Sequence, residues 1–308
     1  MATAELTELL READGGTWWR DNAVIDSPNG TRRLGIDPSA SEGRWAADEF
    51  DRFIVAREVS HRRLRKWEAV PGVGGTLVGV KSQASVSGVP DPLIGRFGVR
   101  GPMTATLDFG GVTGATREVR LALHDPERRS EARIAETTVP SAGDFSAPIA
   151  SFPHRSETVL GLLAMIFADR FSAASGLYMI GPYHADRVPV VLDHRLLSTP
   201  QMWADVINEL EADPTLRGRL QFWVFWYPTG TPITYNALKL REDLATAHRR
   251  HRLPLGVALI GRSMGRLLAR LQVSDPAAPQ RRTGARSGTL RSSDAPMRST
   301  GRCPPIVF

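Results

Sequence analysis

Cysteine is almost absent from this sequence of 308 residues, whose single example is Cys303. One cysteine excludes an intramolecular disulfide and a thiolate metal cluster, and such scarcity is typical of proteins from reducing compartments. The first 16 residues, MATAELTELLREADGG, lack the basic and then apolar pattern of a secretory signal. We therefore expect a cytoplasmic protein.

Long apolar runs are absent as well. The longest apolar stretch, 159–168, is only about ten residues long, whereas a helix that spans a membrane needs about 20. We expect no transmembrane segment, and we expect this stretch to form a buried or interfacial helix.

Acidic residues are outnumbered by basic ones, which gives a formal net charge of +6. The segment 275–308 holds six arginines and two aspartates and so carries +4 of this charge. It is rich in Arg, Ser, Pro, Gly and Thr, with too little apolar surface to offset the entropy of ordering. We expect it to be disordered. Because no RNA- or DNA-binding signature accompanies it, we expect no nucleic-acid partner.

Two regions of different character precede residue 151. We expect residues 1–70 to be mostly helical, because apolar residues recur on a loose helical face over 46–70. In 71–150, the stretches MTATLDF (103–109) and EVRLALH (118–124) alternate apolar and polar residues between glycine-rich breaks. This alternation predicts a small antiparallel β-domain whose strands have one wet face.

Strand and helix patterns alternate in the region 151–274. Three continuous apolar runs predict strands that are buried on both faces: 187–194, 220–228 and 255–261. Amphipathic patterns predict the helices that follow them: 198–214, 233–250 and one that begins at 263. This order predicts a parallel sheet with right-handed crossovers and flanking helices, hence an α/β fold.

The turn GRSMG, residues 261–265, joins the third predicted strand to the third predicted helix. A serine on such a strained turn projects its hydroxyl above the sheet. Gly261 and Gly265 let the strand and the helix approach without Cβ clashes. The start of the helix aims backbone N–H groups at a developing oxyanion. The pattern predicts that Ser263 is a nucleophile.

Three stretches resemble a bacterial family of α/β-hydrolases that comprises esterases and lipases: RVPVVLDHRLLSTPQMW, FWVFWYPTGTPITYNALKLREDL and LIGRSMGRLLARLQVSD. The resemblance implies a partial α/β-hydrolase parallel sheet in 151–274, after a helical segment and a small β-domain. It implies a small-molecule or lipid carboxylic ester as substrate, no metal and no cofactor. The oligomeric state stays open.

The resemblance also implies roles for residues. Ser263 matches the nucleophile, and the N–H of Met264 matches one donor of the oxyanion hole. His194-Arg195-Leu196 matches the family's His-Gly-Leu. The N–H of Leu196 is therefore the implied second donor, and His194 shapes the loop and is not the catalytic histidine.

The chain departs from the family's pattern around this turn. Arg195 replaces a glycine, Arg262 a histidine, and Arg266 a second glycine. Asp193 replaces an apolar residue at the strand end. We expect the arginines to crowd the acyl pocket, and a positive φ at Arg195 would cost about 1–3 kcal/mol.

The acid and the histidine of a catalytic triad are not visible. In α/β-hydrolases both follow the serine along the chain, but no histidine follows His251. The upstream His184 and His248, together with His251, stay open as bases. A hydroxyl without a positioned base is a poor nucleophile. One hypothesis is a truncated or frame-shifted relative with foreign sequence from about Asp275.

Two other interpretations stay open. The first is a non-catalytic binding or interaction protein with a hydrolase-like fold. The second is a protein that binds an anionic polymer through its basic segment 275–308.

Overall fold

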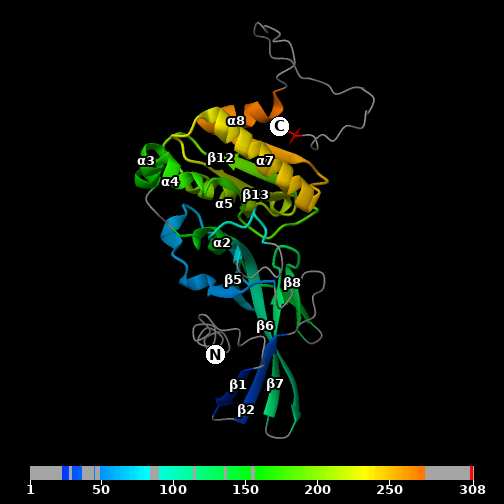
Figure 1. Cartoon of the computed structure of the whole chain (residues 1–308). Helices are drawn as coiled ribbons and strands as arrows, with labels where there is room; N and C mark the ends of the chain where they lie inside the picture. The colour runs from blue at the N-terminus through cyan, green and yellow to red at the C-terminus, as the bar shows by residue number, and fades with distance from the viewer. Residues whose placement is uncertain are drawn as a thin grey trace, which may run out of the picture.

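The computed structural model describes nine parts of the chain: 23–27, 30–36, 45, 49–83, 90–113, 116–134, 137–153, 157–274 and 306–307. The fold is mixed α/β, with one sheet that is mostly antiparallel and a second, mixed sheet flanked by helices. Figure 1 shows the first sheet below and the helix-flanked sheet above it.

The first sheet has six strands in the order β1-β2-β7-β6-β5-β3. Its strands are β1 (Ala23–Ser27), β2 (Gly30–Ile36), β3 (Arg52–Val55), β5 (Gly75–Lys81), β6 (Val99–Thr113) and β7 (Thr116–His124). All neighbours pair antiparallel except β2 and β7, which pair parallel. The two alternating stretches of the sequence lie in β6 and β7, so the predicted antiparallel strands are confirmed.

The prediction that each strand has one solvent-exposed face is wrong for β6, because both faces are buried near the start of this strand. Met103 and Ala105 are buried as expected, but Thr104 between them is buried too. Its hydroxyl donates to the carbonyl of Ala142. The helix α2 (Ser146–Ala150) packs near this face, and so both faces of β6 are covered.

The helix predicted over 46–70 is wrong. Arg52–Val55 forms the edge strand β3, and two short 3-10 turns follow it, η2 (Ala56–Glu58) and η3 (His61–Arg63). Aromatic and β-branched residues in RFIV favour a strand, and pairing with β5 overrides the loose helical spacing. The strands β1 and β2 also lie in the region expected to be helical, while residues 1–22 lie outside the described part.

The second sheet has the strand order β11-β13-β12-β14-β15. Its strands are β11 (Gly176–Met179), β12 (Val188–Asp193), β13 (Leu220–Trp226), β14 (Val257–Gly261) and β15 (Ile306–Val307). The three predicted strands β12, β13 and β14 are parallel, and β15 is parallel to β14. The edge strand β11 is antiparallel to β13, so the sheet is mixed.

Helices cover both faces of this sheet, which explains the continuous apolar runs of its strands. On one face lie α7 (Ile233–His251) and α8 (Met264–Val273), packed against Val191 and Leu259. On the other face lie η5 (Pro200–Trp203), α5 (Ala204–Ala212) and α2, packed against Val190 and Leu192. The amphipathic helix predicted over 233–250 is confirmed as α7, whose buried face includes Ala237, Leu240, Leu244 and Ala247.

The remaining elements are short. They are β4 (Ala69–Val70), paired with β10 (Gly143–Asp144), the hairpin of β8 (Glu131–Ile134) and β9 (Thr137–Pro140), and the helices α3 (Glu157–Ile166), α4 (Ala168–Ser172) and α6 (Pro214–Arg217). The apolar stretch predicted to be a buried or interfacial helix forms α3, yet Leu162 and Ile166 are exposed on it. Among the helices described, none combines the length and apolar character that a membrane span requires.

The last part of the chain was expected to contain no strand. Ile306–Val307 nevertheless pairs with Val257–Ala258 as β15. The rest of the segment 275–308, predicted to be disordered, lies outside the described residues.

Candidate functional site

The turn between β14 and α8 holds Ser263 in a rare backbone conformation. Its φ is 54° and its ψ is −115°, a combination that L residues seldom adopt. Such a conformation costs on the order of 1–3 kcal/mol and persists only where the surrounding structure enforces it. The Ser263 side chain is exposed and does not cap the helix that follows. The serine is therefore presented at the carboxyl end of a parallel strand.

The glycines on either side of Ser263 are needed for close backbone packing. A Cβ atom on Gly261 would lie 2.3 Å from the carbonyl carbon of Gly265. A Cβ atom on Gly265 would lie 2.3 Å from the carbonyl oxygen of Asp193, at the end of the neighbouring strand β12. Both contacts are with backbone atoms, which cannot rotate away. The spacing of the two glycines thus fixes the start of α8 against β14 and β12.

Two backbone N–H groups predicted as oxyanion donors lie beside this turn. The strands β12 and β14 are neighbours, with Asp193 opposite Gly261, so the loop of Leu196 and the first turn of α8 leave the same edge of the sheet. The N–H of Arg262 donates to the carbonyl of Asp193 at 3.1 Å and joins the two loops. Within the described part, neither Leu196 nor Met264 donates its N–H to another backbone group in this region. Both donors are therefore free for a ligand oxygen.

Arg195 does not have a positive φ, so the strain considered for this position does not arise; the left-handed residue of this loop is Leu197, with a φ of 59°. A Cβ atom on Gly161 of α3 would lie 2.5 Å from the carbonyl carbon of Leu197, so α3 packs directly on the loop. The side chains of Arg195, Arg262 and Arg266 are exposed. They surround the turn at the surface, and their crowding of an acyl pocket stays a prediction.

His194 is buried beneath the loop and is held by Tyr227, the residue that follows β13. Its ring stacks on Tyr227 at 4.2 Å between centroids, and Nδ1 lies 3.1 Å from the carbonyl of Arg195. Nε2 accepts the N–H of Tyr227 at 3.4 Å, and the Tyr227 hydroxyl donates to the carbonyl of His194. Burial lowers the pKa of His194 to about 4. A neutral ring with the proton on Nδ1 satisfies these contacts, and it leaves no nitrogen for a serine.

The three histidines left open as bases lie at the wrong end of the sheet. His184 precedes β12, while His248 and His251 end α7 just before β14. They therefore lie at the amino ends of the parallel strands, opposite Ser263. Among the described residues, His194 is the single histidine that directly follows a parallel strand of this sheet. His154 lies outside the described part.

The burial of Asp193, which lies beside the turn of Ser263, could not be predicted from the sequence. It is fully buried at the end of β12, and neither carboxyl oxygen has a hydrogen-bond partner in the described structure. Burial raises the pKa of this carboxyl well above its usual value. Because neither oxygen bonds a histidine or the Ser263 hydroxyl within the described structure, Asp193 does not act as the base for this serine.

The described residues contain no candidate metal site. No group of three His, Cys, Asp or Glu side chains is close enough to hold an ion among those residues. The arrangement at Ser263 consists of an exposed hydroxyl group and nearby backbone N–H groups, two of the features that acyl transfer requires.

Comparisons with family models, curated proteins and solved structures find no match to this chain. The interpretation of the site therefore depends on its own geometry.

Proposed function

We propose that this chain is a serine hydrolase of the α/β-hydrolase type that acts on carboxylic esters. The observation that carries the proposal is the strained conformation of Ser263, with φ 54° and ψ −115°, between a parallel strand and a helix. A serine on such a turn is the mark of a nucleophile elbow. The parallel strands β13, β12 and β14, with helices on both faces, support the same assignment.

The proposed reaction follows from the groups at the turn. The Ser263 oxygen attacks the ester carbonyl, and the carbonyl oxygen becomes an oxyanion that accepts the N–H groups of Met264 and Leu196. The C–O bond to the alcohol then breaks, and the alcohol leaves with a proton. Water hydrolyses the acyl-enzyme and releases the acid. Leu196 and Leu197 are exposed beside the turn and favour an apolar acyl group.

The proton of Ser263 sets the rate in this account. No hydrogen bond joins the Ser263 hydroxyl to a side chain within the described ranges. Enzymes that lose a triad member retain about 10³–10⁴-fold catalysis over water from the oxyanion hole and from binding. We therefore propose slow turnover.

A second candidate function is a non-catalytic binding protein with a hydrolase-like fold. The observation that favours it is the state of His194, whose two ring nitrogens are both engaged by backbone groups. In this case Ser263 has the conformation of a nucleophile elbow but does not attack a substrate.

Ester hydrolysis tests the proposal. We expect purified wild-type protein to hydrolyse p-nitrophenyl acetate and butyrate slowly but above the buffer rate, and Ser263→Ala to remove this excess. The matched control is Ser274→Ala, at the exposed far end of α8, which should leave the rate unchanged. Equal rates for wild type and Ser263→Ala would contradict the proposal.

A further inference from the structure

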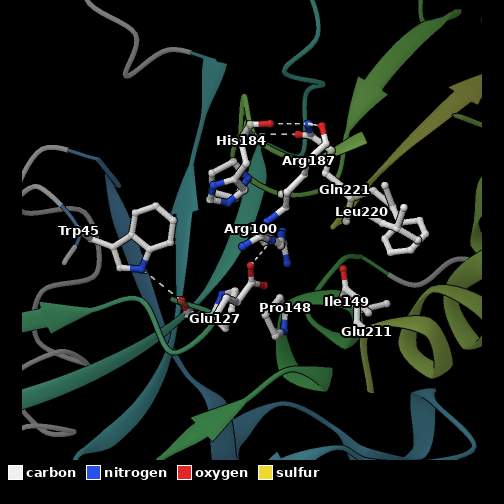
Figure 2. Close-up of a pocket in the computed structure, with 15 residues that line it drawn as sticks. Trp45, Arg100, Glu127, Pro148, Ile149, His184, Arg187, Glu211, Leu220 and Gln221 are labelled. Carbon is white, nitrogen blue, oxygen red and sulfur yellow. Dashed lines mark hydrogen bonds and ion pairs between the residues drawn. The ribbon is translucent and has the colours of Figure 1, made fainter. Parts of the chain in front are cut away.

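A small cavity with apolar and charged walls lies between the two sheets, at the amino ends of β12 and β13. Its walls combine apolar residues such as Ile149 and Pro182 with the charged side chains of Arg100, Arg187 and Glu127. Figure 2 shows Trp45 on one side of the cavity and Leu220 and Ile149 on the other. Because Ser263 lies at the carboxyl end of these parallel strands, the cavity is separate from the proposed hydrolase site.

Arg100 is a buried cation that has no carboxylate partner among the residues that the structure describes. Its side chain is only 4% exposed. One terminal nitrogen donates to the Ser151 hydroxyl at 2.8 Å, the other donates to the Phe97 carbonyl at 3.4 Å, and the guanidinium lies 4.4 Å from the centre of the Phe152 ring. The Nε–H group is buried and has no acceptor among the described residues. A buried charge in this state is costly unless a counter-charge reaches it.

The other charges that act on Arg100 increase this cost. Burial, followed by the charges of the nearby cations Arg52 and Arg63, lowers the pKa of Arg100 to about 10. No carboxylate contributes to this shift. Arg100 therefore stays charged at neutral pH, with other cations as its charged neighbours.

Arg187 provides a second unused donor in the same cavity. Its side chain is 6% exposed. One terminal nitrogen forms an ion pair with the Glu127 carboxylate, as Figure 2 shows, so these two charges neutralise each other. The Nε–H of Arg187 is nevertheless buried and without an acceptor in the described structure. Both unsatisfied groups on the cavity wall are donors.

The remaining titratable groups of the wall leave the cavity positive. Burial, and then the charge of Glu127, raises the pKa of Glu211 to about 8, so this carboxyl is protonated at neutral pH. Burial lowers the pKa of His184 to about 3, so its ring is neutral. With Arg187 and Glu127 paired, the net charge of the wall is the charge of Arg100.

The size of the cavity limits the ligand. Its volume is about 40 Å³, where one water needs about 10–15 Å³. That is room for about three waters or for one carboxylate group with a short alkyl chain. Ile149 and Pro182 offer such a chain an apolar wall.

We propose that this cavity binds a short-chain carboxylate, which pairs with the guanidinium groups of Arg100 and Arg187 and, after these buried side chains adjust, accepts the N–H groups that their Nε atoms leave unused. A carboxylate matches the planar donor geometry of guanidinium groups better than a spherical anion does. The ligand supplies the counter-charge that Arg100 lacks and joins β6 of one sheet to the β12 end of the other.

The test follows arginine Nε–H signals by ¹⁵N–¹H NMR while sodium acetate, sodium propionate or sodium chloride is added to the full chain at constant ionic strength. We expect saturable shifts of two Nε–H signals with acetate and propionate, and weaker binding of chloride. In Arg100→Met the dissociation constant should rise about tenfold or more, because a charge-assisted hydrogen bond is lost. Arg249→Met, exposed on α7, is the matched control and should bind as wild type does.

Several results would overturn the proposal. They are the absence of saturable shifts in the wild-type protein, chloride binding as tight as carboxylate binding, or an unchanged dissociation constant in folded Arg100→Met. If Arg100→Met does not fold, Arg100→Lys takes its place, since it keeps the charge but removes the Nε–H donor. An unchanged dissociation constant in Arg100→Lys would also contradict the proposal.

Discussion

Replacing Gly265 by alanine is expected to lower the free energy of unfolding by about 3 kcal/mol, the upper range for inserting a methyl group into a packed site. The new Cβ would lie 2.3 Å from the carbonyl oxygen and 2.7 Å from the carbonyl carbon of Asp193. These atoms belong to β12, which is held between β13 and β14 and has little room to move. Urea denaturation followed by circular dichroism measures the change.

The matched control for this variant is Gly181→Ala. A Cβ atom there meets its nearest neighbour, the carbonyl oxygen of Arg100, at 3.5 Å, which is ordinary contact. Its free energy of unfolding should stay within about 0.5 kcal/mol of wild type. If both variants lose the same stability, the close approach of α8 to β12 is not the feature that makes Gly265 necessary.

Replacing Asp193 by leucine is expected to raise the free energy of unfolding by about 2 kcal/mol at acidic pH, the cost of a buried polar group without partners, and by more at pH 7. Leucine has the same branching as aspartate, and the side chain is fully buried beside the elbow. Asp193→Asn keeps the shape but removes the ionisation. The matched control is Asp169→Leu on the exposed side of α4, which should change stability by less than about 0.5 kcal/mol.

The stabilisation by Asp193→Leu should depend on pH. Burial raises the pKa of Asp193 in the folded protein above the value of 3.8 for a free side chain. Below that value both states are protonated, so the fold suffers no ionisation penalty. As the pH rises toward the folded pKa, the unfolded chain releases the proton and the folded chain keeps it. Wild-type stability therefore falls by about 1.4 kcal/mol per pH unit from this group.

Urea denaturation of wild type and Asp193→Leu between pH 5 and pH 8 measures this dependence. The advantage of the variant should grow with pH, since other buried acids such as Glu211 are common to both proteins and cancel. A constant difference across this range would show that the Asp193 carboxyl is hydrated or paired in solution.

The regular part of the fold follows from local patterns. The helix α7 is predictable because its apolar residues repeat at helical spacing and pack on one sheet face. The strands β12, β13 and β14 are predictable because both of their faces are covered. In contrast, RFIV at 52–55 forms β3 through pairing with a strand more than twenty residues away, and spacing alone does not contain that partner. The four-residue β11 is too short for any period to show.

Some features of the candidate site are predictable from the local sequence, and others require the three-dimensional structure. Ser263 and its glycines are predictable because the turn needs them within five residues. The exclusion of His248 and His251 requires the topology, which places them at the opposite end of the sheet from Ser263. Similarly, the unpaired state of Arg100 arises from segments far apart in the chain, and no motif announces it.

The most direct test of the central claim is the reaction of Ser263 with a fluorophosphonate. Intact mass spectrometry and peptide mapping of wild type and Ser263→Ala, both shown to be folded by a cooperative urea transition, measure it. We predict one phosphonyl adduct per chain in wild type, located at Ser263, and none in Ser263→Ala. Folded wild-type protein without an adduct, or an adduct that persists in Ser263→Ala, would contradict the assignment of Ser263 as a nucleophile.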